Sequence, residues 1–197
     1  MIIDPENPRA DAGGLRTFKV VSYFTPDYEP EATRLQRSLA DVIVNPHGVR
    51  EIDGMGAWLP NSRFLPIFLE QVHRHEVEST VWLEADSVVL SYPWAFNRIE
   101  SDIGVVFRHG KPLSSVIYAA PSLNARSFLK TWATITKQRP EAPIDITLAA
   151  ILGELEENGG LTIERLPETY AALPHEEGDD VVIKNMKAGK WKRGGAN

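Results

Sequence analysis

The chain has 197 residues, 43% of them hydrophobic, no cysteine and a formal net charge of −6. This size and composition are typical of one globular domain, and the lack of cysteine excludes a disulfide framework, a thiolate zinc site and a cysteine nucleophile. The negative charge argues against nonspecific nucleic-acid binding by the whole surface. No apolar run approaches the roughly 20 residues of a membrane span, and residues 1–14 lack the order of a signal peptide, so we expect a cytoplasmic protein.

The first part of the chain predicts an arm followed by a β-loop-α unit. Residues 1–16 combine prolines, paired glycines and scattered charge, which favours a loose arm. Residues 17–24 predict a strand, and residues 30–41 predict a helix with apolar residues on one face. Two short apolar runs, 42–44 and 49–52, predict a second strand interrupted by a turn.

The rest of the chain alternates between strand and helix patterns. The predicted elements are a helix capped by Asn61 or Ser62, strands at 81–83, 88–90, 102–107 and 116–120, helices at 124–138 and 145–158, and a last strand at 161–166. Such alternation predicts a single three-layer α/β domain with a mostly parallel mixed sheet, which we place at residues 17–183. Residues 184–197 form a basic tail, with five basic residues and no acid between Lys184 and Arg193.

An acidic pair follows the apolar run Val81–Leu83. Glu84 and Asp86 flank Ala85 where a buried parallel strand would leave the sheet, and that edge is where open α/β sheets bind ligands. Two oxygen ligands at this spacing suit a hard divalent cation, which in turn can bind a diphosphate. The alternative is that the pair belongs to a solvated turn.

Several other functional motifs are absent. The chain has no G-x-G-x-x-G after its first strand, no Walker lysine loop and no G-x-S-x-G elbow. A haloacid-dehalogenase-like phosphatase would need an aspartate nucleophile at the first acidic position, which is Glu84 here. His73 and His75 are two apart on a predicted helix and point in different directions, which argues against a metal pair.

A series of short motifs occurs in a familiar order. They are Thr25-Pro26-Asp27-Tyr28, then Trp58, Asn61, Arg63 and Pro66, then Trp82-Leu83-Glu84-Ala85-Asp86, Tyr92-Pro93, Asp102, Ser114-Ser115-Val116, Asp145-Ile146, and Leu166-Pro167-Glu168-Thr169-Tyr170. In this order the chain resembles, from about Val20 to Arg193, the nucleotide-diphospho-sugar glycosyltransferases of GT-A fold, in particular their small bacterial and viral group.

The resemblance implies an enzyme that moves a sugar from a nucleotide-diphosphate donor, with a UDP-sugar favoured, to an acceptor hydroxyl. It implies that Glu84 and Asp86 bind Mn²⁺ or Mg²⁺ and that Asp145 acts with Asp86 in catalysis. The donor would be bound by Thr25, Tyr28, Arg63, Glu84, Ser115, Lys184, Lys187 and Lys190. Tyr28 stands where a nucleobase would enter, and Asp145 starts a helix that faces the site. The alternatives are that Tyr28 packs at the sheet edge, that Asp145 is an N-cap and that Arg63 pairs with a surface acid.

The chain departs from the family pattern at four positions. Glu84 replaces the first aspartate, Leu65 replaces a lysine, Ile146 replaces a glutamine, and Lys184 falls where the family has a metal-binding histidine. We therefore expect a weak metal requirement, with Lys184 and the other tail lysines sharing the charge of the diphosphate. The alternative is that the tail is merely solvated.

The sequence allows more than one class of acceptor. A saccharide or glycan is the default, and a hydroxymethylated base in viral DNA is an alternative because the basic tail suits phosphates. A further alternative is a catalytically degenerate GT-A domain that acts as a binding or scaffold module, since fold alone does not imply function.

Overall fold

The structure is a computed structural model that describes residues 16–42, 44, 48–52 and 63–186. Its main sheet has the order β2-β1-β3-β6-β5-β7, and a second sheet pairs β4 with β8. The strands are β1 (Phe18–Phe24), β2 (Gly48–Glu51), β3 (Ser79–Leu83), β4 (Ser87–Val89), β5 (Ile103–Arg108), β6 (Lys111–Ala119), β7 (Ile163–Leu166) and β8 (Ile183–Asn185). The helices are α1 (Glu29–Asp41), α2 (Leu65–His73), α3 (Leu123–Gln138) and α4 (Ile144–Glu157), with 3₁₀ turns η1 (Pro26–Tyr28), η3 (Trp94–Asn97) and η4 (Glu168–Tyr170).

The main sheet is mostly parallel, as the sequence predicts, with β6 as its antiparallel strand. β2, β1 and β3 run parallel to one another, as do β5 and β7, while β6 runs antiparallel to both β3 and β5. A tight hairpin joins β5 to β6 through His109 and Gly110, whose φ angles of 51° and 75° fit a two-residue turn between twisted strands. The serines expected in a turn before this strand, Ser114 and Ser115, instead lie inside β6.

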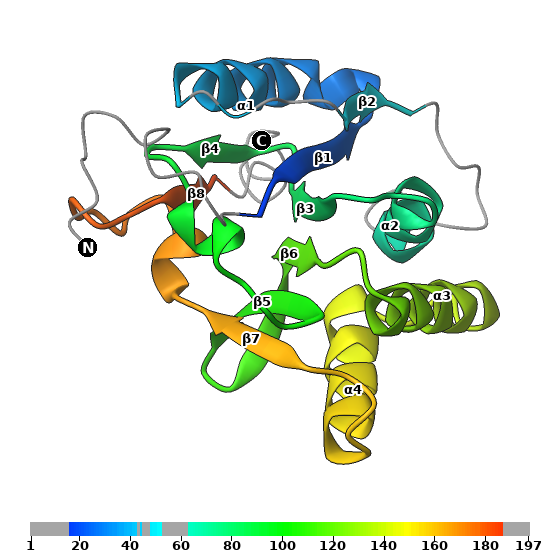
Figure 1. Cartoon of the computed structure of the whole chain (residues 1–197). Helices are drawn as coiled ribbons and strands as arrows, with labels where there is room; N and C mark the ends of the chain where they lie inside the picture. Colours follow the sequence, from blue (N-terminus) through cyan, green and yellow to red (C-terminus); the bar gives the residue numbers. More distant parts are fainter. Residues whose placement is uncertain (1–15, 43, 45–47, 53–62, 187–197) are drawn as a thin grey trace.

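The molecule has three layers (Figure 1). Helices α2, α3 and α4 cover one face of the main sheet, and α1 with the β4–β8 sheet covers the other. Alternating side chains of the strands feed the two cores, so that Val20 packs toward α1 while its neighbour Val21 packs toward α2. The predicted single three-layer α/β domain is therefore confirmed.

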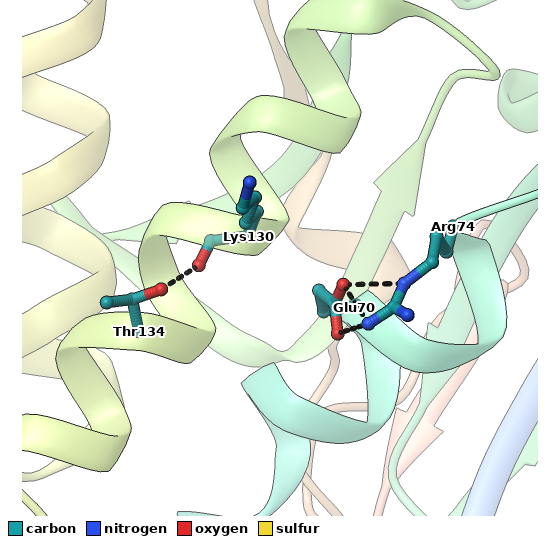
Figure 2. A network of polar contacts seen from close by, with 4 residues as sticks. All are labelled: Glu70, Arg74, Lys130 and Thr134. Atoms are coloured by element: carbon teal, nitrogen blue, oxygen red, sulfur yellow. Dashed lines mark hydrogen bonds and ion pairs between the residues drawn. The ribbon is translucent and has the colours of Figure 1, made fainter.

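Helices α2 and α3 lie side by side (Figure 1). On their outer surface Arg74 donates to both carboxylate oxygens of Glu70, at 2.7 and 2.9 Å, and Thr134 donates to the Lys130 carbonyl (Figure 2). Beneath them the buried His73 ring bonds the Thr80 hydroxyl at 2.8 Å and the Ala120 carbonyl at 2.9 Å. Burial lowers the pKa of His73, so the neutral ring ties α2 to the sheet.

The end of the sheet opposite the carboxyl end of β3 is held by Asp102. Its carboxylate, in a residue that is 9% exposed, accepts hydrogen bonds from Ser122, Asn124 and both the amide and hydroxyl of Thr162. These partners begin α3 and β7, so Asp102 joins two elements to β5. Burial alone would raise the pKa of Asp102, but the hydrogen bonds outweigh it and the pKa is lowered.

Several boundaries differ from the sequence-based expectation. The boundary placed between residues 183 and 184 falls inside β8, which pairs with β4, so Lys184 and Asn185 belong to a strand. Val42 lies in a turn after α1, and the second strand begins only at Gly48. The proposed helix caps Asn61 and Ser62 lie outside the described residues. In the described part of the chain, no helix is both long and apolar enough to cross a membrane.

Candidate functional site

A cleft of about 800 Å³ opens at the carboxyl ends of β1 and β3. This is the sheet edge where parallel strands release their loops and where open α/β sheets bind ligands. Six residues singled out from the sequence line it, namely Thr25, Tyr28, Glu84, Asp86, Ser115 and Asp145. The structure thus brings together residues that are up to 120 positions apart in the chain.

One wall of the cleft is the loop after β1. The Thr25 hydroxyl donates to the Asp27 carboxylate at 2.6 Å, and the Tyr28 amide donates to the Thr25 carbonyl at 2.7 Å. These bonds fold the chain into η1 and then directly into α1. Tyr28, partly buried, lines the cleft from this turn.

The floor of the cleft is the acidic turn between β3 and β4. The Glu84 amide donates to the Ser115 carbonyl at 3.1 Å, and the Ser87 amide donates to the Glu84 carbonyl at 2.9 Å. The turn places both Glu84 and Asp86 in the cleft lining, although Asp86 is only 9% exposed. Two carboxylates therefore face one space from a rigid connection between two strands.

Asn185 is a site residue that the sequence analysis missed. Ile183 and Asn185 share one face of β8, on which Ile183 packs into the core and Asn185 lines the cleft, and the Asn185 side-chain amide donates to Glu84 at 2.5 Å. The next residue, Met186, donates its amide to the Asp86 carbonyl at 3.2 Å. The I-K-N alternation was the available signal, but its use required knowing that residues 183–185 form a strand.

Two cationic residues assigned to the donor do not line the cleft. The Arg63 guanidinium donates to the Pro140 carbonyl, which ties the start of α2 to the loop between α3 and α4. Lys184 sits between Ile183 and Asn185 in β8 and is not among the lining residues. The other two assigned lysines, Lys187 and Lys190, lie outside the described residues, as do Trp58 and Asn61.

Asp145 reaches the cleft from the first turn of α4. Its carboxylate accepts the Ser114 amide at 3.1 Å, and it lies within the helix, whose N-cap is Pro143. The Ser114 carbonyl in turn accepts the Trp82 indole N–H at 3.0 Å. Asp145 is therefore fixed against β6 and exposed to the cleft, and it is not the cap of its own helix.

Tyr23 is a second lining residue that the sequence analysis did not select. Its ring packs against Phe64, Phe68 and Trp82, with centroid distances of 4.9 to 5.6 Å. Burial, and then the negative charge of Glu84, raise the pKa of Tyr23 well above its usual value. Its hydroxyl is therefore neutral beside the acidic turn.

Arg108, at the end of β5, is the one cation among the described residues that line the cleft. It donates to the Ala171 carbonyl at 3.1 Å and to Glu176 at 3.0 Å, and it lies 3.5 Å from the Glu168 carboxylate. Two carboxylates thus compensate its charge. Its position at a strand end on the ligand edge was the signal that could have identified it.

The cleft is acidic on balance. The described lining contains four acidic residues, Asp27, Glu84, Asp86 and Asp145, and one basic residue, Arg108. Nowhere in residues 16–42, 44, 48–52 and 63–186 do three or more histidine or acidic side chains converge on a possible metal position. Glu84 and Asp86 thus offer hard oxygen ligands, and a cation bound there would take its remaining ligands from water or from a bound anion.

A second cavity, of about 390 Å³, lies between α2 and α3 and is lined in part by Glu70, His73 and Arg74. Two of its charged residues are paired with each other, Arg74 with Glu70, and both ring nitrogens of His73 are bonded within the protein. It is also less than half the size of the cleft at the strand ends. The larger cleft is therefore the candidate functional site.

No protein-family model matches the chain, and no curated protein sequence does. Among solved structures, it is similar to a glycosyltransferase involved in the glycosylation of the major capsid of PBCV-1, with 11% identity over 89% of this chain and 96% of that one and a TM-score of 0.64. It is also similar to the galactosyltransferase LgtC, crystallised with donor and acceptor sugar analogs (8% identity, 86% of this chain, 87% of that one, TM-score 0.54). Mouse xyloside xylosyltransferase 1 gives 11% identity, 87% and 98% coverage and a TM-score of 0.55. The chain has the GT-A fold of these proteins.

Proposed function

We propose that the protein is a glycosyltransferase that moves a sugar from a nucleotide-diphosphate donor to an acceptor hydroxyl. The observation that carries this proposal is the cleft at the ligand edge of a GT-A sheet, in which the Thr25–Tyr28 loop and the Glu84–Asp86 turn face one space. The aromatic side chain of Tyr28 suits the base of such a donor. The carboxylates of Glu84 and Asp86 suit a metal ion bound to its diphosphate. The cytoplasmic location expected from the sequence is part of this proposal.

The donor would lie with its base against Tyr28 and its diphosphate over Glu84 and Asp86, with a UDP-sugar favoured. A diphosphate carries negative charge that increases as it leaves the sugar, so positive charge beside it favours the transfer. A Mn²⁺ or Mg²⁺ ion held by Glu84 and Asp86 would supply it and stabilise the leaving diphosphate. We propose that Lys187 and Lys190 share this task, which would weaken the metal requirement.

Asp145 would orient the acceptor and take its proton. In the transfer, the acceptor oxygen forms a bond to the anomeric carbon, the bond from that carbon to the diphosphate oxygen breaks, and the acceptor proton passes to the Asp145 carboxylate. Asp145 is suited to this task because its bond to the Ser114 amide at 3.1 Å fixes its position while its carboxylate stays exposed to the cleft. Asp86 would act on the other side of the reacting carbon, where it would hold the metal ion that stabilises the leaving diphosphate.

A binding or scaffold module without catalysis is the second candidate. The bond from Asn185 to Glu84 favours it, because it engages an oxygen that a metal ion would otherwise use. The two functions differ in outcome, since a binding module would take up the nucleotide but would not transfer or hydrolyse the sugar.

The test is thermal melting with a panel of nucleoside diphosphates, with and without Mn²⁺, followed by assays of donor hydrolysis and transfer. A nucleotide at 100 times its dissociation constant should add about 2.7 kcal/mol to the free energy of unfolding. The Mn²⁺-dependent part of the shift should disappear in Asp86→Asn and persist in Asp41→Asn, a matched change at the exposed end of α1. The absence of a shift with every nucleotide would refute the proposal, and a shift without turnover would favour the binding module.

A further inference from the structure

The acidic turn divides the cleft into two halves. On one side of β3 lies β1 with its loop, and on the other side lie β6 and β5. We call the part lined by Thr25, Asp27 and Tyr28 the nucleotide half. The part beyond the turn, which we call the far half, is lined by Arg108, Leu113, Ser114, Ser115, Ile144, Asp145, Ala171 and Leu173. If the nucleotide occupies the first half and its diphosphate the turn, the far half receives the acceptor.

In the described residues, three aliphatic side chains form an apolar wall in the far half. Leu113 from β6, Ile144 from α4 and Leu173 from the loop after η4 are each partly exposed, so their aliphatic side chains form part of the cleft surface. These three side chains come from three separate elements and line one space. An aliphatic wall contributed by distant segments favours an apolar ligand group, because burying such surface is favourable in itself.

The polar side chains of the far half in the described chain are Arg108, Ser114, Ser115 and Asp145, and the two serines are only 6% and 8% exposed. Arg108 is bound by Glu176 and the Ala171 carbonyl and lies beside Glu168, so its charge is compensated inside the protein. Asp145 remains as the exposed acceptor of a proton. A saccharide would bring several hydroxyl groups against this wall, and each one left without a hydrogen bond on burial would weaken binding.

We infer that the acceptor bears an apolar alkyl or aryl group in addition to its reacting hydroxyl, and that this group packs against Leu113, Ile144 and Leu173 while the hydroxyl meets Asp145. This inference rests on the proposed function and names its acceptor class. It disfavours a DNA acceptor, since a phosphate backbone requires free cations and the one cation of the described far half is paired. It also disfavours a purely saccharide acceptor.

The experiment measures binding of methyl, butyl and hexyl β-glucosides, with maltose for comparison, to protein saturated with Mn²⁺ and the nucleoside diphosphate that gives the largest melting shift. Each methylene buried against the wall should tighten binding about fourfold until the far half is filled. Hexyl glucoside should then bind far more tightly than methyl glucoside or maltose. Equal affinities along the series, or tighter binding of maltose or of an oligonucleotide containing a hydroxymethylated base, would overturn the inference.

Two variants locate the effect. Leu173→Ser should reduce the gain per methylene, with Leu113→Thr as a second variant should the first fail to fold. Leu90→Ser is the matched control, because Leu90 is 51% exposed but does not line the cleft, and it should leave the series unchanged. The melting shift with nucleotide distinguishes failure of the acceptor inference from failure of the proposed function. If the shift is intact but chain length has no effect, the acceptor inference fails alone, and if no nucleotide binds, the proposed function fails.

Discussion

Aspartates occupy opposite ends of the same sheet, and the chain uses them differently. Asp102, before β5, accepts four hydrogen bonds from Ser122, Asn124 and Thr162. Asp86, after β3, lines the large cleft together with Glu84. Both aspartates are 9% exposed, so burial does not distinguish them.

The difference lies in what each carboxylate faces. At the Asp102 end, hydroxyl and amide groups that begin α3 and β7 surround the charge, and the pKa of Asp102 is lowered by these bonds despite its burial. At the other end, Asp86 lines a cleft that three further acidic residues, Asp27, Glu84 and Asp145, also line. A buried charge surrounded by donors stabilises a fold, whereas acids gathered around a cleft suit a cationic or metal-bound ligand.

The largest effect is expected from Asp86→Asn. Under the proposed function this change should lower kcat/KM about a hundredfold, since a metal ion stabilises the leaving group by several kcal/mol and the tail lysines would supply the rest of the positive charge. The melting temperature without ligand should change little, because asparagine has nearly the same shape as aspartate and retains one side-chain oxygen as a hydrogen-bond acceptor. Kinetics with saturating donor and a Mn²⁺ titration measure the effect. A variant that retains wild-type kcat/KM would place the diphosphate away from this turn.

The opposite result is expected from Asp102→Ala. This change removes an ionised acceptor from donors of Ser122, Asn124 and Thr162 and should lower the free energy of unfolding by about 2 kcal/mol, as expected for hydrogen bonds to a charged group. Urea denaturation measures it, with Asp41→Ala as the control, expected to stay within about 0.5 kcal/mol of the wild type. Nucleotide binding below the unfolding transition should be preserved. A stable Asp102→Ala protein would remove the contrast between the two ends of the sheet.

Asn185→Ala should have an intermediate effect confined to the cleft. It removes the amide that donates to Glu84, and loss of a group that orients a metal ligand typically changes metal affinity about 10- to 100-fold. The affinity for Mn²⁺, measured by calorimetry or by electron paramagnetic resonance without any substrate, should fall by that factor if Asn185 orients Glu84, whereas a rise would show that Asn185 competes with the metal ion. Asn185→Gln, which keeps the amide at a greater reach, is the matched variant. Unchanged affinity in both would mean that the bond is only structural.

The stability contributed by Asp102 should also depend on pH. Because its folded pKa is lowered, the ionised form stabilises the protein above the unfolded pKa of about 3.9, and this stability is lost as pH falls through the lower folded value. The stability difference between the wild type and Asp102→Asn should therefore be constant near neutral pH and shrink below about pH 4. A difference that grows on acidification would contradict the hydrogen-bonded ionised state.

The smallest effect is expected on the outer surface of α2. The Glu70–Arg74 pair is an i,i+4 contact whose arginine side chain is 55% exposed, and such pairs contribute about 0.3–0.5 kcal/mol. Arg74→Ala should lower the unfolding free energy by no more than this, and less in high salt. A loss of unfolding free energy above about 1 kcal/mol would show that this pair contributes more than an exposed ion pair usually does.

Local pattern in the sequence predicted most of the fold and part of the site. The periodicity of apolar residues placed α1, α3 and α4 to within a residue or two, because burial on one face leaves a repeat that can be read locally. The acidic pair was located for a similar reason, since an apolar strand followed by carboxylates marks a strand end. Thr25, Tyr28, Ser115 and Asp145 line the same cleft as that pair.

Tertiary structure alone decided which distant residues meet. Asn185 reaches Glu84 across 101 positions because β8 pairs with β4, and Arg108 enters the cleft because a hairpin reverses the chain after β5. Lys184, one residue from Asn185, is excluded from the lining by strand alternation. Strand pairing and register depend on contacts between segments far apart in the chain, so a shift of one residue exchanges the side chain that faces the site, and no local pattern determines it.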